Sequence, residues 1–161
     1  MSREYLVSAA AITLANQPVT LAFVNPGTTA SLEFTRAWAS QAANATSAQQ
    51  RVQLSSQVTA FPTLVTATPT KNKLSDPASL ITGGTAGAAG TCGINASAEG
   101  AGAKTVLYPD SFNVLNGWLW VPTPSETIIM NASGASGLGL HFPAAPTTLT
   151  SWSAGMGYRE L

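Results

Sequence analysis

The stretch FNVLNGWLWVPTPSETII, residues 112–129, concentrates large side chains in a chain that is made mostly of small ones. Trp118 and Trp120 lie two residues apart, so on an extended strand they share one face, while Leu119 and Val121 point to the opposite face. A glycine precedes the pair, and two prolines end the run. The segment therefore predicts a closely packed strand that stops sharply, with its tryptophans in a core or at a contact surface.

Strand-like segments recur between turn signals along the rest of the chain. Alternation of apolar and polar residues is clearest at 32–37 and 51–55, which is typical of strands with one buried face. Ten prolines disfavour long helices. The pattern predicts an all-β fold, an antiparallel β-sandwich of the jelly-roll type with few or no long helices. The expected strands are 5–14, 19–24, 31–40, 51–60, 64–68, 105–107, 112–121, 127–130, 138–142 and 149–158.

Two segments allow more than one interpretation. Residues 37–50, AWASQAANATSAQQ, have the propensity of a helix, but they also fit a loop between two strands, and we favour the loop. Residues 83–103, from Gly83 to Ala103, lack large side chains apart from Ile94. This tract fits a flexible loop or strands that pack very close together, and the sequence does not choose between them.

Length and composition bound the class of protein. A chain of 161 residues fits a single β-sandwich domain spanning 1–161. Charged residues make up 9% of the chain, against about 25% in ordinary soluble proteins, and the formal net charge is zero. Lysines and arginines are scattered and no apolar run is long enough to span a membrane, so we expect neither a nucleic-acid nor a membrane partner. Near-zero charge favours association, which predicts a surface partly covered by neighbours.

The sequence lacks the motifs of common active sites. In EGAGAKT, residues 99–105, Ala103 replaces the glycine that a phosphate-binding loop needs before its lysine. In GASGL, residues 134–138, Leu138 replaces the last glycine of a hydrolase nucleophile elbow. Metal ligands do not cluster at any recognisable spacing. We therefore expect no catalytic residues, no cofactor, no metal site and no enzymatic activity.

Four polar or reactive residues receive structural interpretations instead. The single histidine, His141, lies in an alternating run and is expected on one face of a strand. The single cysteine, Cys92, is expected to be a small buried hydrophobic residue. Asp76 and Asp110 each adjoin a proline and are interpreted as turn residues.

Three segments resemble the small β-rich structural proteins encoded among the head genes of tailed bacteriophages. These are SAQQRVQLSSQV at 47–58, GGTAGAAGTCGINASAEGAG at 83–102 and FNVLNGWLWVPTPSETIIM at 112–130. The chain is similar to capsid decoration, or cement, proteins. The resemblance implies a jelly roll or related sandwich, usually trimeric, on the outer capsid surface of the virion. The implied partners are further copies of the chain in a homotrimer and the major capsid protein.

The resemblance leads to one main functional hypothesis and one alternative. The main hypothesis is a virion structural protein that decorates the outer capsid surface and stabilises contacts between major capsid subunits. The alternative is a receptor- or glycan-binding head domain of a phage tail fibre or spike, in which exposed aromatic side chains stack on sugars. Within the main hypothesis, Arg36 and Arg51 are candidate interface anchors, because charges retained in so neutral a chain should have partners, whereas a solvated strand face is the favoured account of either arginine taken alone. The candidate core or interface residues are Trp38, Trp118, Trp120, Trp152, Arg36 and Arg51.

Overall fold

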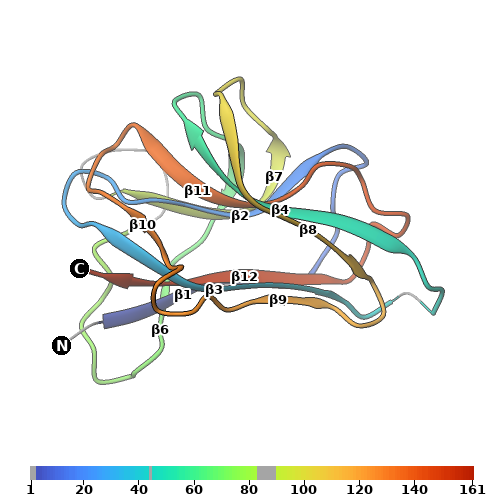
Figure 1. Ribbon diagram of the computed structural model, residues 1–161, viewed down its shortest axis with the longest axis horizontal. Helices are drawn as coiled ribbons and strands as arrows, with labels where there is room; N and C mark the ends of the chain where they lie inside the picture. The colour runs from blue at the N-terminus through green and yellow to red at the C-terminus, as the bar shows by residue number, and fades with distance from the viewer. Residues whose placement is uncertain (1–2, 44, 83–89) are drawn as a thin grey trace.

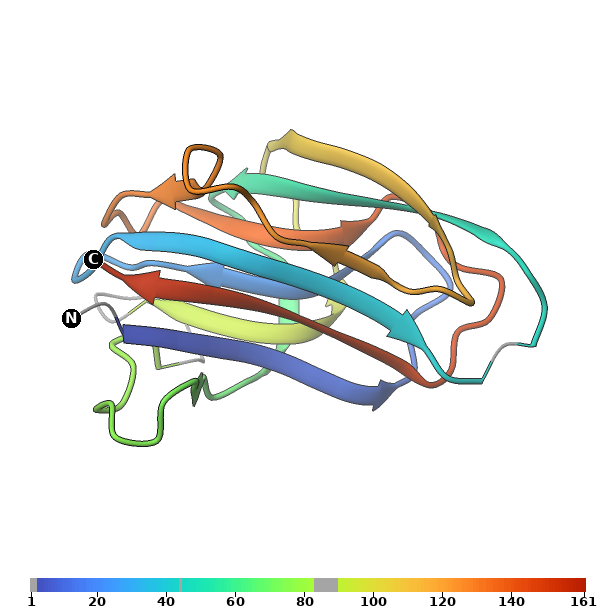
Figure 2. The same ribbon diagram turned by 60° about the horizontal axis from the view of Figure 1, so that its bottom comes forward.

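The computed structural model describes residues 3–43, 45–82 and 90–161, which form two antiparallel β-sheets packed face to face (Figures 1 and 2). The predicted all-β sandwich is thus confirmed, and the described residues contain no helix. The strands are β1 (Arg3–Ile12), β2 (Val19–Asn25), β3 (Leu32–Gln41), β4 (Gln49–Val58), β5 (Thr63–Thr66), β6 (Thr70–Lys71), β7 (Thr91–Ala98), β8 (Lys104–Asn113), β9 (Trp118–Trp120), β10 (Ile128–Met130), β11 (Ser136–Phe142) and β12 (Trp152–Glu160).

The chain crosses repeatedly between the two sheets. The first sheet has the strand order β10-β3-β12-β1-β6, and β9 also pairs with β3. The second sheet has the order β5-β7-β2-β11-β4-β8. The pairing is nested, because β1 pairs with β12, β2 with β11 and β4 with β8, all antiparallel. Both chain ends consequently lie at the same end of the sandwich (Figure 1).

The core lies between the sheets and is filled by alternate residues of the strands. At one end of the core, where β11 ends and β12 begins, the ring of Trp152 meets Phe142 and Phe112 edge-on, with centroids 5.0 and 6.4 Å apart. Strand β2 is buried on both faces, which a plain sandwich strand is not. The outer side of β2 is covered where Phe23 packs on Phe61, whose ring centroids are 5.2 Å apart. The second sheet is therefore shielded on its outer face near β2.

Residues 112–121 do not form one continuous strand, although the sequence predicts one there. Strand β8 ends at Asn113, and β9 begins only at Trp118. Asn113 stabilises the intervening turn, since its side-chain oxygen accepts from the N–H of Leu115 at 3.0 Å. Gly117 adopts a φ of +69°, which residues with a side chain rarely adopt, and returns the chain to the first sheet. The turn moves the chain from one sheet to the other within four residues, 114–117.

The two ambiguous segments resolve differently. Strands β3 and β4 extend into the 37–50 segment and leave a short connection between Gln41 and Gln49, and its described residues, 42–43 and 45–48, contain no helix. Within 83–103, residues 91–98 form β7, and residues 83–89 lie outside the described part of the chain. A Cβ added at Gly93 would lie 2.6 Å from the Cβ of Leu64 on the neighbouring strand. The small residues of β7 thus allow close strand packing. From the sequence alone, a flexible loop and close-packed strands were equal alternatives.

Candidate functional site

The three-residue strand β9 separates two distinct surfaces. Trp118 and Trp120 are 7% and 6% exposed and face the interior, whereas Leu119 and Val121 are 66% and 63% exposed. The alternation predicted from the sequence therefore holds in the structure. The tryptophans fit because they lie opposite Ala39 and Ala37 of β3, whose small side chains leave room for the indole rings.

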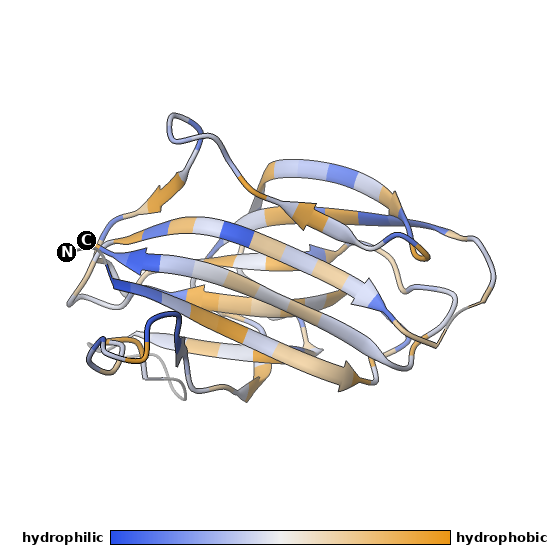
Figure 3. Cartoon of the chain, turned by 90° about the horizontal axis from the view of Figure 1, so that it is seen from below, coloured by the Kyte–Doolittle hydropathy of each residue, from blue (hydrophilic) through white to orange (hydrophobic). Residues whose placement is uncertain are grey.

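On the outer side of the first sheet, four apolar side chains lie along the edge formed by β9 and β10, and we call them the outer apolar face: Trp38, Leu119, Val121 and Ile129. Ile129 lies opposite Glu33, and the polar residues Thr35 and Arg36 of β3 separate it from the other three. Trp38 and Leu119 are directly paired across β3 and β9. Trp38 lies against the glycine backbone of β12, because a Cβ at Gly155 would be 2.3 Å from its Cζ2 atom. The short strands of this edge are strongly hydrophobic beside the paler strands of the sheet (Figure 3). Such clustering of exposed apolar groups is typical of a contact surface.

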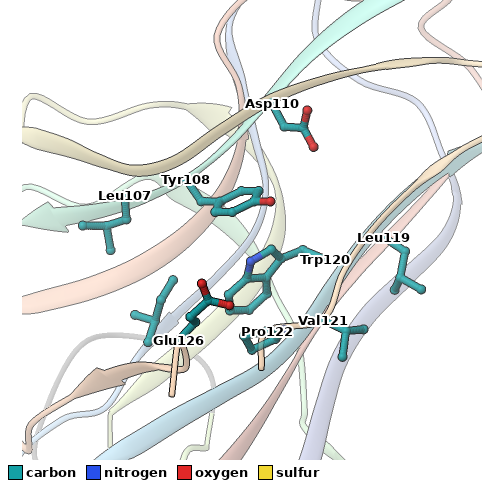
Figure 4. Close-up of a pocket in the computed structure, with 9 residues that line it drawn as sticks. Leu107, Tyr108, Asp110, Leu119, Trp120, Val121, Pro122 and Glu126 are labelled. Atoms are coloured by element: carbon teal, nitrogen blue, oxygen red, sulfur yellow. The ribbon is translucent and has the colours of Figure 1, made fainter. Parts of the chain in front are cut away.

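Beside β9 lies a hollow of about 320 Å³, which we call the β8–β9 cleft, and Leu119 and Val121 form part of its rim. Its main lining residues are Leu107, Tyr108 and Asp110 of β8, Trp120 of β9, and Glu126 from the following loop. The rings of Tyr108 and Trp120 lie side by side with centroids 6.1 Å apart, and the carboxylates of Asp110 and Glu126 flank them (Figure 4). The cleft therefore combines aromatic rings with two acidic groups.

Asp110 connects the two sheets at this cleft. Its Oδ2 atom accepts a hydrogen bond from the indole N–H of Trp118 at 2.9 Å. The interpretation of Asp110 as a turn residue is wrong, because it lies within β8, opposite Val52 of β4. In contrast with Trp118, the indole N–H of Trp120 makes no hydrogen bond within the described part of the chain. An unpaired donor at the edge of a cleft is available to a ligand.

Strand β8 forms an edge of the second sheet, but this edge is a poor template for another strand. Pro109 at its middle has no backbone N–H to donate. The register with β4 also shifts between Tyr108 and Val106. Proline and irregular register are devices that prevent edge-to-edge pairing. Contacts made here would therefore run through side chains.

A second polar site lies on the outer side of the second sheet, where Glu99 gathers three other side chains. Its carboxylate pairs with Lys104, accepts from the hydroxyl of Thr20 at 2.7 Å, and lies 3.1 Å from Nδ1 of His141. Burial by itself raises the pKa of Glu99, but the hydrogen bonds from His141, Lys104 and Thr20 outweigh it and lower that pKa to about 2. Glu99 thereby ties the chain between β7 and β8 to β2 and β11.

The geometry of this cluster differs from that of a catalytic triad. In a triad, the nucleophile and the carboxylate contact different nitrogens of the histidine. Here the Thr20 hydroxyl lies 3.3 Å from Nδ1 of His141, the same nitrogen that faces Glu99. Across residues 3–43, 45–82 and 90–161, no group of three or more His, Cys, Asp or Glu side chains is placed to hold a metal ion. His141 lies on a strand, as expected, and contributes to the packing of that strand's outer face.

The remaining candidates occupy three environments. Trp152 is fully buried in the core. Arg36 lies on the outer side of the first sheet and pairs with Glu4 of β1 at 3.1 Å, so its partner lies within the chain. Arg51 is exposed on β4 and forms no ion pair with another described residue. A role of Trp152, Arg36 and Arg51 at an interface stays a prediction.

Cys92 is buried as expected, and burial raises the pKa of its thiol to about 12.

Glu99, Tyr108 and Glu126 were not predicted as site residues from the sequence. Tyr108 had a usable signal, because it shares the two-residue spacing of Asp110 and Phe112, which predicts one strand face. Glu99 had none, since His141 is 42 positions away and only the fold brings the two together. Glu126 could not be predicted from local sequence either, because it lies in the connection between β9 and β10 and its position depends on where those strands pair.

Comparison with known proteins adds no relative: no family model, curated protein or solved structure matches this chain. No helix long and apolar enough to cross a membrane occurs among the described residues. The features of this chain from which a function can be inferred are the outer apolar face, the β8–β9 cleft and the cluster at Glu99.

Proposed function

We propose that this protein is a virion structural protein of a tailed bacteriophage, which decorates the outer capsid surface and stabilises contacts between major capsid subunits as a homotrimer. The outer apolar face carries the proposal. Leu119, Val121 and Ile129 are each more than half exposed, whereas Trp118, Trp120 and Met130 of the same segments are buried. Exposed apolar side chains that cluster on one face are typical of protein interfaces.

The connectivity of the sandwich supports the same proposal. The nested pairs β1 with β12, β2 with β11 and β4 with β8 follow the order expected of a jelly roll, with β5, β6 and β7 as an insertion. We assign the fold to this type. Jelly rolls occur widely in viral capsid proteins, and the resemblance of three segments to decoration proteins agrees with that assignment.

Such a protein needs no reactive group, because its effect is thermodynamic. A protein that binds only the assembled shell stabilises the shell by mass action. Trimer symmetry multiplies each weak contact, since the second and third contacts form at high effective concentration. The low charge of the chain suits large interfaces that use apolar contacts and uncharged hydrogen bonds.

The proposal is tested by the mass of the protein in solution and by its sedimentation with preassembled shells. Light scattering after size-exclusion chromatography should give a trimer for the natural sequence. Val121→Asp, which places a charge on the outer apolar face, should dissociate the trimer or abolish shell binding. Val65→Asp is the matched control, because Val65 is similarly exposed, at 57% against 63%, but lies on β5 of the other sheet. A stable monomer without affinity for shells would refute the proposal.

A further inference from the structure

We propose that the β8–β9 cleft binds a neutral pyranose sugar. This inference goes beyond the proposed function. Leu119 and Val121 belong both to the outer apolar face and to the rim of the cleft, so the inference is tested on Tyr108 and Trp120, which lie outside that face. Figure 4 shows the side chain of Leu119 directed away from the Tyr108 and Trp120 rings, at the edge of the cleft. Three features of the cleft support the proposal: its aromatic rings, its unpaired hydrogen-bonding groups and its charge.

The aromatic rings offer a stacking surface of suitable size. Tyr108 is 44% exposed although it contacts Trp120, so part of its ring is open to the cleft. The C–H groups on one face of a pyranose are apolar, and they pack well against such a ring. The hollow of about 320 Å³ lies at the small end of ligand pockets, which range from about 300 to 1,000 Å³. It suits a short saccharide segment.

The polar groups of the cleft require a ligand that both donates and accepts hydrogen bonds. The indole N–H of Trp120 has no partner within the described part of the chain, so it can donate to a ligand in the cleft. Asp110 accepts from the indole N–H of Trp118 at Oδ2 and from the backbone N–H of Ser111 at Oδ1. Glu126 accepts from the hydroxyl of Thr123 at Oε2 and keeps Oε1 for a donor. A sugar hydroxyl supplies both functions from one group.

The charge of the cleft selects against other ligands. Its two carboxylates face no lysine or arginine among the lining residues. Phosphates, uronates and sialic acids would be repelled, which disfavours nucleotides and acidic glycans. A cationic ligand would satisfy the carboxylates but would leave the donor of Trp120 unpaired. A neutral sugar is the class that meets all of these conditions.

The indole N–H signal of Trp120 in a ¹⁵N–¹H NMR spectrum provides a direct test. The chain has four tryptophans, and Trp120→Phe identifies which signal belongs to Trp120. The probes are maltopentaose, cellopentaose and chitotriose as neutral sugars, with trigalacturonate as the acidic comparison. At least one neutral probe should shift the Trp120 signal in a saturable manner, with a Kd of about 1 mM or below. Trigalacturonate should leave the signal unchanged.

Variants of Tyr108 separate binding from folding. Tyr108→Ala should weaken binding of the active probe by about tenfold or more, because it removes the stacking ring. Tyr108→Phe keeps the ring and should lose less, which shows that the effect is not one of misfolding. Val65→Ala, at the opposite edge of the second sheet from Tyr108, should bind as the natural sequence does. A Trp120 signal unmoved by all three neutral probes would overturn the proposal, as would equal binding of trigalacturonate or full binding by Tyr108→Ala.

Discussion

Replacing Glu99 with glutamine should flatten the acid dependence of stability. In the folded protein, Glu99 accepts hydrogen bonds from His141, Lys104 and Thr20, and its pKa falls to about 2 from an ordinary value of 4.5. A carboxylate with a lowered pKa stabilises the folded state above its unfolded pKa. That contribution is lost as the pH falls from 4.5 through about 2, because in this range the unfolded state binds a proton at Glu99 that the folded state does not.

The size of the effect follows from the two pKa values. Their difference, at about 1.4 kcal/mol for each pH unit, corresponds to an upper figure of about 3 kcal/mol in the free energy of unfolding. The Glu99 side chain is 19% exposed, so solvent screens the cluster only in part. We expect the natural sequence to lose about 2 to 3 kcal/mol across this pH range through Glu99 alone.

Urea denaturation followed by tryptophan fluorescence measures this loss at each pH. Glu99→Gln should be less stable than the natural sequence near neutral pH, and the two should converge as the pH approaches 2. Glu126→Gln is the matched control, since it removes the same charge from an exposed position that has only Thr123 as a hydrogen-bond partner. It should keep the acid dependence of the natural sequence. Parallel pH curves for Glu99→Gln and the natural sequence would refute the reasoning.

Two further substitutions test the packing around β9. Trp120→Ala should lower the free energy of unfolding by about 3 to 5 kcal/mol in urea denaturation, because it empties a buried site, and a near-neutral effect would contradict that burial. Gly155→Ala should cost about 1 to 3 kcal/mol and shift tryptophan emission to the red, because the new methyl group displaces Trp38 from the sheet. Gly134→Ala is its control, with no atom within 4 Å of the added Cβ, and equal stability of the two variants would show that Trp38 does not pack on Gly155.

The predictable part of the fold is the part set by local patterns. The alternation around Trp118 and Trp120 gave the correct inward and outward faces, because a strand has a fixed two-residue period whatever its neighbours. The break between β8 and β9 was not predictable in the same way. Asn113 and Gly117 are ordinary turn formers, yet the aromatic residues on both sides favour a strand, and only the change of sheet decides between them.

The candidate sites depend on long-range pairing, which one sequence does not display. Trp38 meets Leu119 only because β3 pairs with β9, about eighty positions further along the chain. Asp110 was interpreted from its neighbour Pro109, but a proline is also tolerated in an edge strand, and β8 is one. Residue type and spacing therefore identified what could be buried, while the sheet order determined which side chains meet.

The bond between Asp110 and Trp118 explains how a strand as short as β9 can present two surfaces. Three residues paired to β3 alone provide few backbone hydrogen bonds, and such a strand is expected to be weakly held. The 2.9 Å bond joins β9 in the first sheet to β8 in the second, and the buried indole rings add packing against the core. Held from its inner side in this way, β9 leaves Leu119 and Val121 free to face a partner. The same anchoring fixes Trp120 beside Tyr108, which holds the aromatic wall of the β8–β9 cleft in place.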